Sequence, residues 1–214
     1  MTPTSHTDFV IGIDFDNTIA NYDDLIGEVS RDRGLIPEDH RVGKTEVRRI
    51  VRSQPDGELE WRKVQAVVYG SRMHEAKLAD GVDAFFRQCR QRQAKSYVVS
   101  HKTRYSDYDP SQTNLRTASL EWMNDHRFFD RDGLALSRED VFFENTRLDK
   151  IERMKILRCT HFIDDLEEIF LETSFPTSVQ KILYSPRGKT SSVSGIKSAA
   201  TWNEISECIF APAS

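Results

Sequence analysis

The sequence predicts an α/β fold in which helices flank a doubly wound parallel sheet and a helical segment is inserted near the start of the chain. Short runs of β-branched and aromatic residues alternate with amphipathic helical patterns over most of the 214 residues. Several of these runs stop on carboxylates or a hydroxyl. Residues 20–78, in contrast, show helical periodicity with no strand signal.

The first expected strand is Phe9–Ile13, an apolar run without alternation. Such a run is typical of a strand buried on both faces, as in a parallel sheet. It ends at Asp14 and Asp16, and ligands of open α/β sheets bind at this end of the strands. The pattern indicates an active site where a divalent cation could bridge the two acids. The alternative is an Asp-rich turn.

The pattern of apolar residues in the inserted segment, residues 20–78, predicts three helices. Their apolar stripes are Tyr22, Leu25, Ile26 and Val29, then Val47, Ile50 and Val51, then Trp61, Val64 and Val68. These spacings follow the helical period. We expect an all-helical insertion between the first strand and the next.

From residue 79 onward, strands and helices alternate. The expected strands are Ser96–Ser100, Asp140–Glu144, Thr160–Asp165 and Val179–Tyr184. The expected helices open near residues 82, 113, 151, 166 and 202. This alternation predicts right-handed crossovers in a parallel sheet. Residues 8–19 and 79–214 would form the catalytic core, and residues 1–7 a flexible tail.

Composition and charge exclude several classes of protein. A net charge of -4 argues against a nucleic-acid partner held by phosphate contacts. Cys89, Cys159 and Cys208 are few and far apart, which favours free thiols in a reducing compartment. The sequence has no apolar run of membrane-spanning length and no signal-peptide pattern at its start, so we expect no membrane partner and a cytoplasmic location. The oligomeric state stays open.

Polar residues also end other expected strands. Ser100 ends the second, and Asp164 with Asp165 ends the fourth. Because the carboxyl ends of parallel strands share one sheet edge, these residues and Asp14 should converge. Lys150 precedes the fourth strand and could reach the same edge, with Lys155 as the competing cation.

This set resembles the haloacid dehalogenase superfamily of phosphatases and phosphotransferases. The resemblance covers residues 9–184 through four motifs in order, which are Asp14-Phe-Asp-Asn-Thr18, Ser100, Lys150 and Asp164-Asp165. It implies a Rossmann-like core with a substrate-selecting cap. Asn17 stands where the family more often has glycine.

The resemblance also implies residue roles. Asp14 would be the nucleophile that forms an aspartyl-phosphate. Asp16 would act as general acid and then general base, and its backbone carbonyl would help hold the metal. Thr18 and Ser100 would donate hydrogen bonds to the phosphoryl oxygens, and Lys150 would neutralise charge.

The same resemblance implies a Mg²⁺ ion held by Asp14 and Asp165, a cation that prefers oxygen ligands. Asp165 occupies the place of the family's metal-binding acid. Asp164 would orient the metal-binding residues without contacting the ion itself, although the acid pair leaves open which of the two binds the metal directly.

The expected function is Mg²⁺-dependent hydrolysis of a small phosphorylated metabolite, most simply a phosphomonoester. The alternatives are a phosphomutase or phosphotransferase with the same site, phosphonate cleavage through Lys44, or a silent binding protein with this fold. His101, Lys102 and Thr103 are expected on a loop after Ser100, where they either contact substrate or only stabilise the loop.

Overall fold

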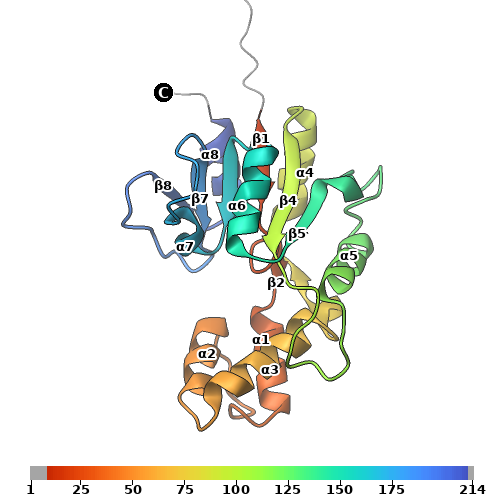
Figure 1. Ribbon diagram of the computed structural model, residues 1–214, viewed down its shortest axis with the longest axis vertical. Coiled ribbons are helices and arrows are strands. Elements are labelled where there is room, and N and C mark those ends of the chain that lie inside the picture. The colour runs from red at the N-terminus through yellow and green to blue at the C-terminus, as the bar shows by residue number, and fades with distance from the viewer. Residues whose placement is uncertain (1–8, 212–214) are drawn as a thin grey trace, which may run out of the picture. The chain divides into compact units, whose positions relative to one another are not determined.

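The computed structural model describes residues 9–211, which form two compact units (Figure 1). The sheet unit contains the residues up to Ile19, Ala79–His101 and the residues from Phe129 onward. The helical unit contains Ala20–Leu78 and Lys102–Phe128. Among residues 9–211, no helix combines the length and apolar character that a membrane span requires. The prediction of a tail at residues 1–7 lies outside the described residues.

The sheet unit is built on six parallel strands in the order β5-β4-β1-β6-β7-β8. The strands are β1 (Val10–Ile13), β4 (Lys95–His101), β5 (Val141–Glu144), β6 (His161–Asp164), β7 (Gln180–Tyr184) and β8 (Ile196–Ala199). This arrangement confirms the predicted doubly wound parallel sheet, with β1 near its centre. Sequence reasoning missed β8, a four-residue edge strand whose exposed Lys197 and half-buried Ser198 interrupt the apolar pattern.

Helices lie on both faces of this sheet, with α6 in front and α4 behind it in Figure 1. They are α4 (Val82–Gln91), α6 (Arg147–Ile156), α7 (Glu167–Phe170) and α8 (Trp202–Phe210), with a 3₁₀ turn, η2 (Arg138–Asp140). Helix α6 buries Ile151 and Met154 in one apolar cluster with Val99 and Phe162. On the other side, the rings of Phe85 of α4 and Trp202 of α8 pack in a tilted arrangement, with their centroids 5.0 Å apart.

Gly12 of β1 leaves room for the apolar packing on the side of the sheet that α6 covers. A Cβ atom at this position would lie 2.5 Å from the Phe162 ring and 3.1 Å from the Cys159 sulfur. No carbon can approach so closely, so a side chain at residue 12 would displace Phe162. The glycine therefore lets β6 present Phe162 against the central strand.

The helical unit contains the three predicted helices of the insertion. These are α1 (Asp23–Asp32), α2 (Lys44–Arg52) and α3 (Gly57–Tyr69), followed by a 3₁₀ turn, η1 (Met73–Glu75). The expectation of an all-helical segment was wrong in one respect. Strands β2 (Ala20–Asn21) and β3 (Lys77–Leu78) pair antiparallel at its two ends. Two residues per strand are too few to show a periodicity of two in the sequence.

Residues 102–128 pack with the helical unit, although the sequence-based division assigned them to the core. Helix α5 (Leu115–Asp125) lies against η1, and its Trp122 indole nitrogen donates to the Ala76 carbonyl at 2.8 Å. The Nε of Arg116 donates to the Lys102 carbonyl at 2.9 Å. Helical periodicity identified α5 correctly but carries no information on which unit receives its apolar face.

Candidate active site

The carboxyl ends of three adjacent strands carry the residues that the sequence singled out. Asp14 directly follows β1, Ser100 is the last residue but one of β4, and Asp164 ends β6 with Asp165 next. Since β4, β1 and β6 are neighbours and parallel, their ends share one edge. Asp14, Ser100 and Asp164 are each less than 5% exposed, so the edge holds buried polar groups.

Lys150 joins two of these strands through ion pairs. Its Nζ atom lies 2.5 Å from Oδ1 of Asp14 and 2.6 Å from Oδ2 of Asp164. Helix α6 carries it there, and the Thr146 hydroxyl caps that helix by accepting from the Asp149 amide at 3.1 Å. The competing cation, Lys155, instead pairs with Glu152 on the surface of α6 at 2.6 Å. Of the two lysines, Lys150 is the one that lies among the carboxylates.

The charges of this buried group depend strongly on one another. Burial alone would lower the pKa of Lys150, but the attraction of Asp14 and Asp164 and their hydrogen bonds outweigh it, and the pKa lies above its ordinary value. Burial, aided by repulsion from Asp14 and opposed by Lys150, raises the pKa of Asp164 to about 6. A single ammonium thus faces more carboxylate charge than it neutralises.

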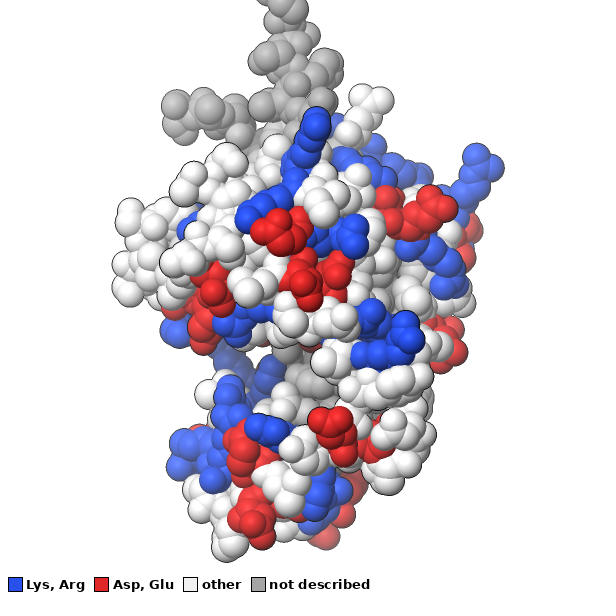
Figure 2. Space-filling model, viewed as in Figure 1, with Lys and Arg blue, Asp and Glu red and all other residues white. Residues whose placement is uncertain are grey.

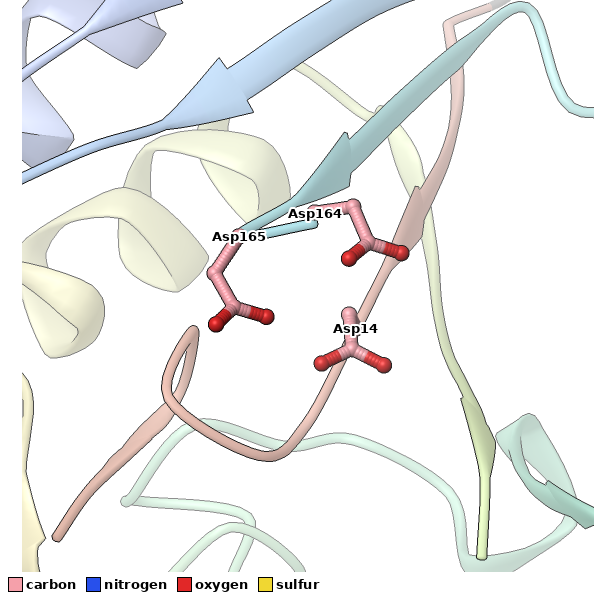
Figure 3. Close-up of side chains that lie close together, drawn as sticks. All are labelled: Asp14, Asp164 and Asp165. Carbon is pink, nitrogen blue, oxygen red and sulfur yellow. The ribbon is translucent and has the colours of Figure 1, made fainter. Parts of the chain in front are cut away.

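Asp14, Asp164 and Asp165 form a group that could hold a metal ion (Figure 3). Each offers a carboxylate oxygen, and the three oxygens lie within 4.8 Å of one another. Asp164 also accepts a hydrogen bond from the Leu166 amide at 2.9 Å through Oδ1, which fixes its orientation. The group does not include Asp16, which lies two residues beyond Asp14 and is half-buried.

The turn after β1 contains buried polar atoms without a protein partner. Asn17 adopts a left-handed conformation, with φ of 61°, which asparagine tolerates better than most residues. The Thr18 hydroxyl is fully buried, and within residues 9–211 it has no hydrogen-bond partner. Buried polar groups are nearly always hydrogen-bonded, so the orphaned Thr18 hydroxyl is a candidate donor to a bound ligand.

His101 is the last residue of β4 and not, as expected, part of the loop after it. Its Nδ1 atom is buried and has no partner among the described residues. Burial, Lys150 and Arg147 lower the pKa of His101, and Asp14 and Asp16 oppose them only partly. His101 lies two residues after Val99, and side chains two residues apart on a strand share one face of the sheet. The sequence therefore contained an indication of the orientation of His101 that the motif search did not use.

Taken together, the parallel sheet and its acidic edge define an α/β protein with a carboxylate and lysine centre. No protein-family model matches the chain, and no curated protein matches it. Solved structures of haloacid dehalogenase superfamily hydrolases do match at the level of the fold. The chain therefore has the haloacid dehalogenase fold, as the sequence motifs predicted.

Three of these solved structures illustrate the similarity. A subfamily IA hydrolase from Geobacter sulfurreducens aligns with a TM-score of 0.56 and 11% identity over 98% of this chain and 100% of that one. A putative hydrolase from Bacillus subtilis, bound to magnesium, aligns with a TM-score of 0.54 and 13% identity over 94% and 98%. A hydrolase from Deinococcus radiodurans with bound phosphate and sodium gives 0.53 and 12% over 96% and 99%. At such identities the likeness shows the fold alone.

Proposed function

We propose that the protein is a Mg²⁺-dependent phosphohydrolase that acts on a small phosphorylated metabolite through an aspartyl-phosphate on Asp14. The observation that carries this proposal is the buried Lys150, which bridges Asp14 and Asp164 at 2.5 and 2.6 Å inside a group of three carboxylates. Phosphoryl transfer needs little beyond positioned charges of both signs, and the site supplies them.

Asp14 is the nucleophile in this proposal. Lys150 contacts its Oδ1, which leaves Oδ2 to attack phosphorus. The ammonium of Lys150 also offsets negative charge on the phosphoryl oxygens.

Asp16, Thr18 and Ser100 complete the chemistry. Asp16 is half-buried and so keeps access to solvent, and in this proposal it protonates the leaving group and later accepts a proton from water. Thr18 and Ser100 donate their hydroxyls to the phosphoryl oxygens, and the orphaned Thr18 hydroxyl supports this role.

The carboxylate group suits Mg²⁺, because a hard divalent cation prefers oxygen ligands and the three acids carry excess negative charge. Asp14 and Asp165 would hold the ion with the Asp16 carbonyl, and Asp164 would orient the site through Lys150 and the Leu166 amide. When bound, the ion supplies positive charge that offsets the charge of the phosphoryl group.

The substrate is proposed to be a small molecule rather than a nucleic acid. Acidic and basic side chains are interspersed on the face seen in Figure 2. Several arginines of the described chain pair with acids, as Arg49 does with Glu46 at 2.5 Å. The helical unit would serve as the cap that selects the substrate. Cys89, Cys159 and Cys208 are free thiols, which fits the proposed cytoplasmic location.

The proposal is tested by phosphate release from p-nitrophenyl phosphate and from a panel of metabolites, with Mg²⁺ and with a chelator. Wild type should release phosphate only with metal, and Asp14→Asn should lower the rate at least about 10³-fold. Asp149→Asn, at an exposed acid of α6, is the matched control and should keep full activity.

Equal rates for Asp14→Asn and wild type would remove Asp14 as nucleophile. Transfer of the phosphoryl group to an added alcohol in preference to water would reassign the protein as a phosphotransferase. Absence of both turnover and phosphate binding would favour a silent binding protein.

A further inference from the structure

One polar side chain at the sheet edge has no part in the chemistry described above. His101 ends β4 directly after Ser100, is half-buried, and keeps a buried Nδ1 atom that has no hydrogen-bond partner among the described residues. An imidazole nitrogen in this state loses its hydrogen bonds to water without gaining others, a cost that a bound ligand would remove.

Strand geometry places the His101 side chain on the face that carries Lys150. Side chains alternate along a strand, so residues 97, 99 and 101 of β4 share one face. Tyr97 and Val99 both pack into the apolar cluster of α6 that contains Ile151 and Met154. His101 therefore points to the α6 side of the sheet, and Ser100 to the opposite side.

The same parity rule places Asp14 on this face. Val10 packs against the α6 cluster, and a Cβ on Gly12 would meet Phe162 of that cluster, so residue 14 follows on the same side. Since Ile13 is in register with Val98, Asp14 comes next to the part of β4 that carries Val99 and His101, and Asp14 and Asp16 both interact electrostatically with His101. The imidazole thus lies on the neighbouring strand, two residues closer to its carboxyl end than the position level with Asp14.

The charged groups around His101 come from three elements. Lys150 and Arg147 belong to α6, and Asp14 with Asp16 to the segment after β1. On the other side, Glu144 of β5 is in register with His101, but Arg153 binds its carboxylate at 2.7 Å. Burial and the two cations outweigh the two acids, so the pKa of His101 is lowered, which favours the neutral imidazole.

We propose that His101 is a substrate-contacting residue that donates a hydrogen bond from Nδ1 to the phosphoryl group. This inference rests on the proposed phosphohydrolase function and adds a contact to it. As a neutral donor, His101 adds no charge beside Lys150. In this proposal the phosphoryl group accepts hydrogen bonds from three side chains, which are Ser100, Thr18 and His101. His101 donates from the α6 side of the sheet.

The test compares three variants of the full chain with p-nitrophenyl phosphate as substrate and inorganic phosphate as competitive inhibitor. His101→Ala should lower kcat/KM and weaken phosphate inhibition about 10- to 100-fold, the size expected for one hydrogen bond to a charged group. His101→Asn keeps a donor near the position of Nδ1 and should retain most of the activity. His101→Gln places its donor near Nε2 and should behave like alanine. His74→Ala, at an exposed histidine, is the control.

The pH profile separates this role from two others. A neutral donor predicts that the ratio of wild-type to His101→Ala activity stays constant between pH 7 and 9. A ratio that falls as pH rises would show a cationic role instead, and equal losses for Asn, Gln and Ala with a lowered Tm would show a purely structural one. Either result overturns the inference.

Failure of the underlying function gives a different outcome. If wild type neither hydrolyses p-nitrophenyl phosphate nor binds inorganic phosphate, the phosphohydrolase proposal fails and the His101 contact fails with it. If wild type is active, loses activity in Asp14→Asn, and is unaffected by His101→Ala, only the His101 inference is wrong.

Discussion

The Nζ atom of Lys150 lies 2.5 Å from Oδ1 of Asp14, although 136 residues separate them in the chain. Both side chains are almost fully buried, and Asp164 lies 2.6 Å from the same ammonium. The pair therefore bears on stability as well as on the proposed chemistry, because a buried charge without its partner is costly.

Replacement of Lys150 by Met should destabilise the protein by about 3–5 kcal/mol, since Asp14 and Asp164 would then face each other without a cation. Urea unfolding measures this loss, and Lys155→Met serves as the control because Lys155 is partly exposed on α6. Mg²⁺ should restore part of the stability of Lys150→Met. Equal stabilities for the two variants would mean that the buried ion pairs contribute nothing.

Asp165→Asn should raise the Mg²⁺ concentration that gives half-maximal activity at least about 10- to 100-fold, because it removes a proposed metal ligand. Asp164→Asn should raise it less and should lower stability more, since Asp164 binds Lys150 and the Leu166 amide. Activity titrations with Mg²⁺ and urea unfolding measure the two effects. The reverse order would assign the direct metal contact to Asp164.

Asp16→Asn should slow hydrolysis of alkyl phosphates by about 10²- to 10⁴-fold, because their leaving group needs a proton. With p-nitrophenyl phosphate the leaving group departs readily, so the loss in its release should be roughly tenfold or less. Single-turnover measurements of alcohol or phenol release isolate that step. A uniform loss across both substrate types would exclude Asp16 as the general acid.

The contribution of His161 to the stability of the sheet unit should fall as the pH drops below about 6.5. Burial is the main cause that lowers the pKa of His161, and it outweighs a hydrogen bond between the imidazole and Gln180, which raises the pKa. Between the lowered folded value and the ordinary unfolded value, the unfolded chain binds the additional proton, so protons favour unfolding. Above pH 7 both states are neutral and this dependence vanishes.

Urea unfolding of wild type and His161→Gln at pH 7.5 and pH 5.5 measures this contribution. The variant should lose less stability between the two pH values than wild type, whatever its stability at pH 7.5. A variant that loses as much as wild type would show that His161 titrates alike in both states.

Much of the fold followed from local patterns. The apolar run before Asp14, the strand that contains Ser100 and the helices of residues 20–78 lie where periodicity predicted them. Strand β8 was missed because it is an edge strand of four residues, and the β2–β3 pair because each strand has only two. Patterns this short do not exceed chance in a sequence.

The candidate site was also predictable in part from local patterns. Motifs at strand ends indicated the shared edge, because parallel strands place their carboxyl ends together. His101 was expected on a loop, since a polar residue after Ser100 reads as the end of the strand. In the structure β4 extends through His101, and its pairing with Glu144 of β5 decides this.

By itself, the sequence determined the parallel sheet, the acids at its edge and the three helices of the insertion, because each depends on residues close together in the chain. Tertiary structure alone decided that Lys150 lies against Asp14 while Lys155 pairs with Glu152, and that residues 102–128 join the helical unit. The physical reason is that periodicity reports which face of an element is buried, whereas the partner of that face depends on contacts across the whole fold.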